Sequence, residues 1–74
     1  MAIPDPRAYM TLPELLDELE VAHPQEVADF ERRHPLAITA VIEDGYEQPQ
    51  EADDDELEEA LTDLREDLQA RLRI

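Results

Sequence analysis

Leucines recur at helical spacing over the last quarter of the chain, four, three, four and four residues apart. Because a helical turn takes 3.6 residues, these side chains share one face of a helix. The pattern predicts a long C-terminal helix over about 54–73, begun by a capping aspartate. We expect this face, the leucine seam, to form either a core contact or a dimer contact. The seam consists of Leu57, Leu61, Leu64, Leu68 and Leu72.

A second amphipathic pattern begins at Thr11, with Glu14 at the spacing of a helix capping box. Apolar residues then follow on one face, which predicts a helix that starts at Thr11. This face consists of Leu12, Leu15, Leu16, Leu19 and Ala22.

Two His-Pro pairs divide the middle of the chain, at His23-Pro24 and His34-Pro35. Proline disfavours helix at the residue before it and fits the first turn of a new helix. We therefore expect a short helix over 24–33 and a second element from Pro35. Each histidine is interpreted as a helix-boundary residue rather than a ligand.

The segment 36–42 is ambiguous, because its β-branched residues favour a strand whereas Pro35 and Gly45 frame a helix. A lone strand leaves its backbone groups unpaired, and no other segment of the chain reads as a strand. We therefore predict a helix, apolar nearly all round and buried at the centre of the fold. Strand pairing between two copies across a two-fold axis is the alternative.

Together these patterns predict an all-α fold, a small bundle of three to four helices with a long acidic C-terminal helix. An extended arm is expected over 1–10, where Pro4 and Pro6 disfavour helix, and one helical domain over 11–74 with a connector at 46–52. A chain of 74 residues without cysteine has no disulfide to stabilise it, so we expect a homodimer that buries further surface.

Charge narrows the classes of partner. The chain has 21 Asp and Glu residues against six Arg and no Lys, for a formal net charge of -15. Nucleic acid and anionic membranes would be repelled, so we expect no direct nucleic-acid or membrane binding, whereas a basic protein surface would be attracted. No leader or apolar span is recognisable, which makes the cytoplasm the expected location.

The negative charge is concentrated in one part of the chain. Residues 43–67 hold 13 acids and one base, and six carboxylates occupy the seven positions 53–59. On a helix that density would be about one charge per 1.7 Å of axis, close to that of duplex DNA.

This concentration favours an inhibitor that mimics the charge of nucleic acid and blocks the basic groove of a DNA- or RNA-binding protein. Such inhibitors are often encoded by phages or mobile elements, and we expect such an origin here. The expected partner-binding residues are Glu43, Asp44, Glu47, Asp53, Asp54, Asp55, Glu56, Glu58, Glu59, Asp63, Glu66 and Asp67.

Two other interpretations remain open. The protein could be a helical interaction module, such as an antitoxin or a regulatory subunit, that binds through apolar helix faces. Its acidic surface would then serve solubility or adaptation to concentrated salt. Salt adaptation is also an interpretation by itself, since it would account for the acids without any binding function. Adaptation should distribute acids evenly, so their concentration over 43–67 favours a dedicated surface.

Enzymatic chemistry is not expected, because the chain has no Cys, Ser or Lys and is short for a catalytic pocket. Gly45 and Glu51 have the spacing of a calcium-binding EF-hand loop, but Ala40 and Ile42 would then occupy its first ligand positions. We therefore predict no metal site, no cofactor and no catalytic residues.

Overall fold

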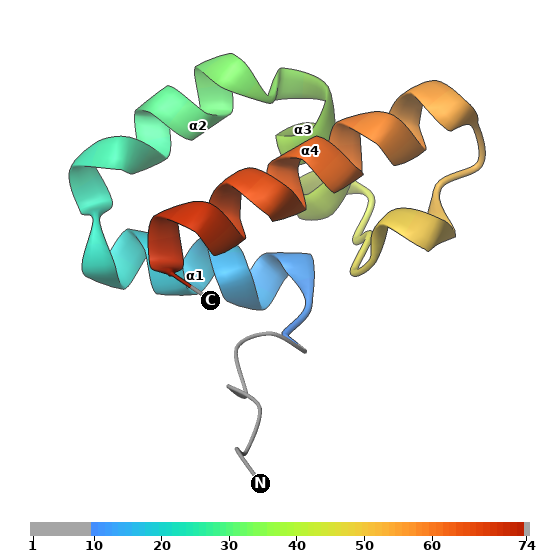
Figure 1. The fold of residues 1–74 in the computed structure, drawn as a ribbon. Coiled ribbons are helices and arrows are strands. Elements are labelled where there is room, and N and C mark those ends of the chain that lie inside the picture. Colours follow the sequence, from blue (N-terminus) through green and yellow to red (C-terminus); the bar gives the residue numbers. More distant parts are fainter. Residues whose placement is uncertain (1–9, 74) are drawn as a thin grey trace, which may run out of the picture.

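Four α-helices form within residues 10–73, which are the residues that this computed structural model describes (Figure 1). They are α1 (Leu12–Ala22), α2 (Val27–Arg33), α3 (Pro35–Glu43) and α4 (Asp55–Leu72). One-turn 3-10 helices, η2 (Pro24–Glu26) and η3 (Pro49–Glu51), precede α2 and α4. This part of the chain contains no strand, so the predicted all-α fold is confirmed and residues 36–42 are helical.

The prolines begin new elements where the sequence placed them. Pro24 opens η2 and Pro35 opens α3, and both preceding histidines have non-helical backbone, with φ near -140° at His23 and -130° at His34. The helix predicted over 24–33 differs in one respect, because its first turn is a 3-10 turn. The Glu26 N–H donates to the His23 carbonyl at 2.9 Å, a contact three residues apart.

Side chains cap the two longer helices at their N-termini. Glu14 accepts hydrogen bonds from the Thr11 N–H at 3.2 Å and from the Thr11 hydroxyl at 2.9 Å, as the capping box predicts. Asp54 is the aspartate that caps α4, and it accepts from the Leu57 N–H at 2.7 Å. At the other end of α4, Arg73 adopts a left-handed conformation with φ of 59°, which ends the helix.

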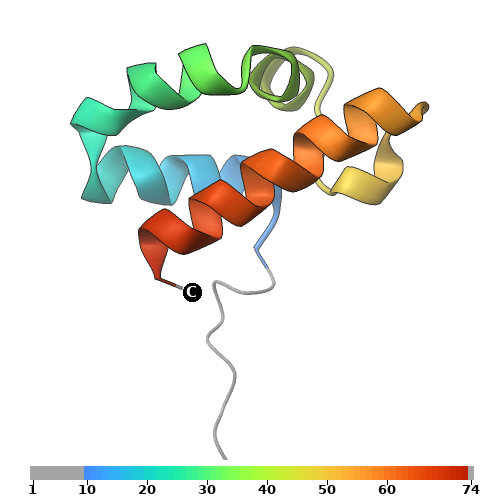
Figure 2. The same cartoon turned by 45° about the horizontal axis from the view of Figure 1, so that its top comes forward.

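The long helix α4 packs on α1 and α3 and passes in front of α1 in both views (Figures 1 and 2). Its packing on α1 and α3 buries the leucine seam, in which Leu61, Leu64 and Leu68 are fully buried and Leu57 is half-buried. Each fully buried leucine stabilises the fold by about 1.5–3 kcal/mol. The seam therefore belongs to the core of a single copy and is not free to form a dimer. A homodimer through another surface stays a prediction.

Two expectations about burial were wrong. The helix α3 is not buried all round, since Ala37, Ile38 and Val41 face the core whereas Leu36 and Ile42 are 48% and 66% exposed. The described helices cover only one side of α3. Ala22 belongs to the predicted apolar face of α1 but is exposed, because it lies in the last turn before the chain leaves for η2.

The connector at 46–52 is tied to the helices. The Tyr46 N–H donates to the Ala40 carbonyl at 3.3 Å, and the Leu12 N–H donates to the Glu47 carbonyl at 2.9 Å. Tyr46 and Ala52 also pack against the core. The arm predicted over 1–10 lies outside the described residues, apart from Met10, which packs on the core.

Within residues 10–73, no helix combines the length and the apolar character that crossing a bilayer requires.

Candidate acidic binding surface

Carboxylates line the side of α4 that faces away from the core. Asp55, Glu59, Asp63 and Glu66 follow one another at four, four and three residues, so a rotation of about 100° per residue places them in one row. By the same rotation the row lies opposite the leucine seam. All four side chains are exposed, and we call this row the acidic ridge.

A second group of carboxylates lies where the chain passes from α3 to α4. Glu43 and Asp44 end α3, Glu47 follows in the connector, and Asp53 and Asp54 lead into α4. All are exposed. The end of α3, the connector and the start of α4 lie at one end of the molecule (Figure 1), which we call the acidic end.

Tyr46 lies at the acidic end and contacts one of its carboxylates. The Tyr46 hydroxyl donates a hydrogen bond to Asp53 at 3.4 Å. Desolvation raises the pKa of Tyr46, and the neighbouring Asp53 carboxylate raises it further.

The observed start of α4 corrects the charge density expected from the sequence. That density assumed a helix from Asp53 onward, but Asp54 has an extended backbone with φ of -137° and ψ of 163°, and the helix begins at Asp55. An extended backbone rises about 3.3 Å per residue, so Asp53 and Asp54 are spaced more widely than helical neighbours. The density of one charge per 1.7 Å is therefore not reached.

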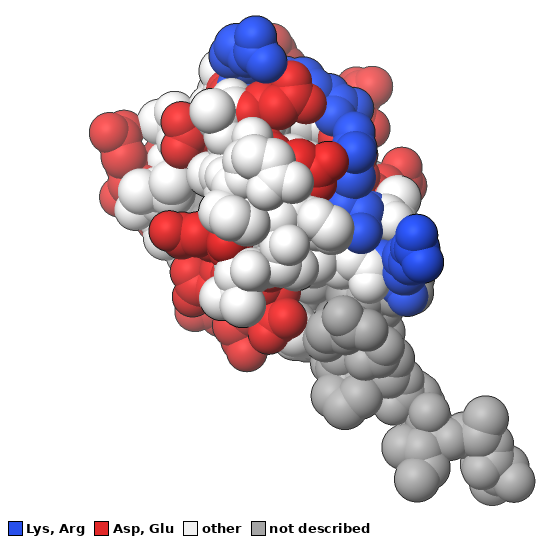
Figure 3. Space-filling model, turned by 90° about the vertical axis from the view of Figure 1, so that its left-hand side faces the viewer, with Lys and Arg blue, Asp and Glu red and all other residues white. Residues whose placement is uncertain are grey.

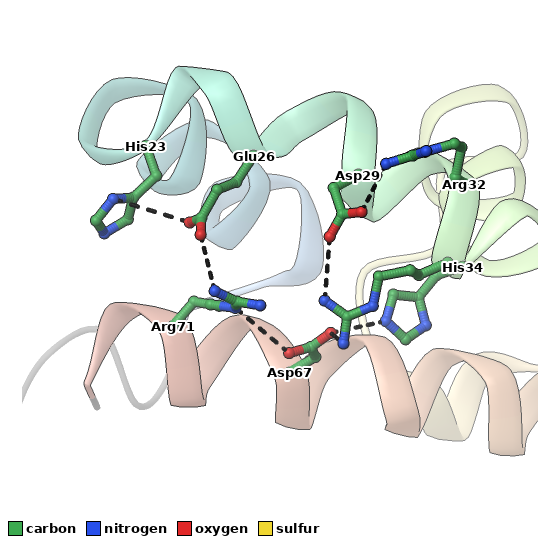
Figure 4. Close-up of polar contacts among 8 residues, drawn as sticks. His23, Glu26, Asp29, Arg32, His34, Asp67 and Arg71 are labelled. Carbon is green, nitrogen blue, oxygen red and sulfur yellow. Dashed lines mark hydrogen bonds and ion pairs between the residues drawn. The ribbon is translucent and has the colours of Figure 1, made fainter.

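Asp67 differs from the other predicted partner-binding residues, because it is half-buried against neighbouring side chains. Its side chain is 18% exposed. Its Oδ2 atom lies 3.0 Å from both Arg33 Nη2 and His34 Nε2, and its Oδ1 atom lies 3.9 Å from Arg71 Nε. Figure 4 shows these groups between α2 and α4. Asp67 thus joins α4 to α2 and to His34, which lies between α2 and α3, whereas the remaining predicted partner-binding residues are all exposed.

The arginines are paired away from the acidic ridge. Asp29 binds Arg32 at 2.8 Å and Arg33 at 3.3 Å on α2, and Arg71 on α4 binds Glu26 at 2.8 Å. These contacts and those of Asp67 form a row between α2 and α4 (Figure 4). Figure 3 shows arginines in a strip along one side of this face, with carboxylates beside them and a further group of carboxylates on the opposite side. Arg65, the one base between 43 and 67, hydrogen-bonds Gln48.

Sequence reasoning missed the contact between His34 and Asp67, whose positions are 33 residues apart. No local pattern links two such residues. One signal was present: Asp67 lies next to Leu68 and three residues after Leu64, at the border of the buried face. An acid at that border can turn toward a neighbouring helix rather than toward solvent.

No protein-family model, no curated protein and no solved structure matches this chain. Among residues 10–73, no three His, Asp or Glu side chains are grouped so that they could hold a metal ion. Function must therefore be inferred from the arrangement of the side chains themselves.

Proposed function

We propose that the protein is a non-enzymatic inhibitor whose acidic ridge and acidic end occupy the basic groove of a DNA- or RNA-binding protein. One observation carries this proposal: exposed carboxylates gather on the acidic ridge and the acidic end, whereas Arg32, Arg33 and Arg71 pair with other acids, Asp29, Asp67 and Glu26. A surface of one sign attracts an opposite surface at long range and displaces the natural polyanion.

The spacing of charge along α4 supports mimicry of a single phosphate strand. Six carboxylates lie between Asp55 and Glu66, a length of about 16 Å at 1.5 Å per residue. That is about one charge per 3 Å, close to the spacing of about 3.4 Å along one strand of duplex DNA. The expected target is therefore a groove that follows one nucleic-acid backbone.

Helix stability alone does not account for the ridge. Asp55, Glu56 and Glu58 lie in the first turn, where negative charge stabilises a helix through its dipole. Glu59 and Asp63 lie beyond that turn and four residues apart, a spacing at which like charges repel. Local rules that are broken without a structural gain are typical of functional surfaces.

The absence of the usual nucleophiles supports a binding function without catalysis. The chain has no Cys, Ser or Lys, and it has only two histidines. His34 is occupied by Asp67, and His23 lies 3.8 Å from Glu26.

Two variants of equal charge test the proposal. The ridge variant carries Glu59→Gln, Asp63→Asn and Glu66→Gln, all on exposed positions beyond the first turn of α4. The matched control, which we call the rim variant, carries Asp17→Asn, Glu20→Gln and Glu31→Gln, on exposed positions of α1 and α2. Each variant removes one Asp and two Glu charges, so both have the same net charge.

The tagged wild-type chain should capture nucleic-acid-binding proteins from a lysate of its source organism at about 0.1 M salt and release them at about 0.5 M. Added DNA or RNA should compete, and mass spectrometry identifies the proteins released. The ridge variant should lose this capture and the rim variant should keep it. Equal capture by both variants, or capture that nucleic acid does not displace, would contradict the proposal.

A further inference from the structure

A groove of about 420 Å³ lies between α1, α2 and α3, and no residue of α4 lines it. It is therefore separate from the acidic ridge. Its apolar lining consists of Pro13, Leu16, Val27, Ile38, Val41 and Ile42.

The floor of the groove is the outer surface of the core. Ile38 and Val41 are 7% and 4% exposed, and Leu16 and Val27 are half-buried. Ile42 is 66% exposed at the groove, one turn after Ile38 on α3. An isoleucine exposed to water contributes little of the free energy that its burial would provide. A partner that covered this side of α3 would therefore gain that free energy.

Carboxylates form the rim of the groove. Asp17 and Glu20 come from α1 and Glu31 comes from α2, and all three side chains are exposed. Among residues 10–73 no ion pair joins any of them to a basic side chain, and Arg32, Arg33 and Arg71 bind other acids. The groove thus combines an apolar floor with a negative rim.

We propose that this groove binds an amphipathic helix of a partner protein, with apolar side chains on one stripe and Lys or Arg beside that stripe. The apolar stripe would cover Ile42 and the floor, and the cations would pair with the rim acids on α1 and α2. Recognition of an amphipathic helix by an apolar groove between helices is a recurrent mode of peptide binding. The opposite charge of the flanking residues selects a basic helix over a neutral or acidic one.

A second copy of the chain fits this groove less well. Binding of a second copy would bring the rim acids Asp17, Glu20 and Glu31 close to the carboxylates of another molecule with a net charge of -15. The most regular apolar face that the second copy could offer, the leucine seam, is already buried in the core of that copy. Charge therefore favours a basic partner.

A synthetic peptide serves as the probe. It has about 16 residues, with Leu at helical spacing on one stripe, Lys and Arg beside the stripe and Ala elsewhere. A scrambled peptide of the same composition spreads the leucines around the helix, and so controls for attraction between opposite charges. Both are titrated into the ¹⁵N-labelled full chain at about 0.15 M salt, and amide shifts are followed by NMR.

Amide shifts with the amphipathic peptide should cluster on α1, α2 and α3 around Leu16, Val27 and Ile42. Ile42→Arg should weaken binding about tenfold or more, because it removes an apolar contact and adds a repelling charge. Leu36→Arg is the matched control, since Leu36 is also exposed on α3 but does not line the groove. It should bind as the wild type does.

The rim and ridge variants separate this site from the proposed inhibitor surface. The rim variant should weaken peptide binding and the ridge variant should not, which is the reverse of their expected effects on capture of nucleic-acid-binding proteins. The groove proposal is overturned if the scrambled peptide binds equally well, if the shifts fall on α4, or if Leu36→Arg and Ile42→Arg weaken binding alike. No binding of either peptide would also overturn it.

Discussion

Two aspartates one helical turn apart on α4 have opposite surroundings. Asp63 is exposed on the acidic ridge, whereas Asp67 is 18% exposed and lies 3.0 Å from both Arg33 and His34. The same residue type therefore serves a surface at one position and a helix junction at the next turn. This junction adds directional bonds to the apolar packing between the helices, as does the ion pair between Arg71 and Glu26.

Asp67→Ala should lower the free energy of unfolding by about 1–3 kcal/mol, because it leaves His34 without its half-buried acceptor and removes one of the two carboxylates that Arg33 binds. Asp63→Ala should change it by no more than about 0.5 kcal/mol, or raise it slightly by relieving repulsion. Both substitutions bring the same gain in helix propensity, so the difference between their unfolding free energies measures the contribution of the Asp67 contacts. Urea unfolding at neutral pH measures it, and equal effects of the two substitutions would refute the structural role of Asp67.

Glu14 makes a contribution to stability that depends on pH. Hydrogen bonds from Thr11, first from its hydroxyl and then from its N–H, hold the pKa of Glu14 below its ordinary value of 4.5. A lowered pKa in the folded state means that this contribution is complete above pH 4.5. It is lost as the pH falls through the lowered pKa of the folded state.

Thr11→Val should therefore raise the pKa of Glu14 toward 4.5, since it removes the hydroxyl that donates the stronger bond. The side-chain carboxyl of Glu14 can be titrated by NMR in both proteins. The acid-induced fall in the urea midpoint should also be smaller in the variant. An unchanged pKa would show that the hydroxyl does not act on Glu14 in solution.

At the scale of elements, the helices were predictable because their signals are local. The leucine spacing, the Thr11 and Glu14 pair and the two prolines each act within one or two turns, and α1, α3 and α4 form where these signals place them. The start of α4 was uncertain among three adjacent aspartates, since each can cap a helix. The exposed side of α3 was not predictable, because it depends on how many helices pack against it rather than on its own residues.

The sites also divide into features that local sequence signals determine and features that depend on packing between helices. Exposure of the acidic ridge follows from its position opposite the leucine seam, and the helical period was enough to predict it. The Asp67 junction brings α2 and α4 together with His34, and the groove beside Ile42 combines three helices. Their existence depends on the packing angles between those helices, which hydrophobic periodicity does not encode.

The leucine seam gives a prediction at this scale. Leu64→Ala should lower the free energy of unfolding by about 2–5 kcal/mol, because Leu64 is fully buried and its truncation leaves a cavity. The loss should be the same at about 10 µM and about 1 mM protein, since the seam packs within one copy. A loss that depends on protein concentration would instead place the seam in a contact between copies.

The whole molecule carries a net charge of -15 on 74 residues, and its stability should depend on salt. Repulsion among exposed carboxylates opposes folding, and salt screens it over a Debye length of about 10 Å at 0.1 M. The urea midpoint should therefore rise between about 0.05 M and about 0.5 M salt. The urea midpoint of the ridge variant, which has three fewer negative charges, should rise less over the same range of salt. A wild-type midpoint independent of salt would show that the repulsion is negligible.

The pairing of arginines near the C-terminal half of α4 has a consequence for the way the molecule approaches a partner. Carboxylates dominate the acidic end, while Arg71 offsets Glu26 near the C-terminal end of α4. This separation gives the molecule a permanent dipole moment in addition to its net charge. In the field of a basic surface it would experience a torque as well as an attraction, and so would rotate to arrive with its acidic end first.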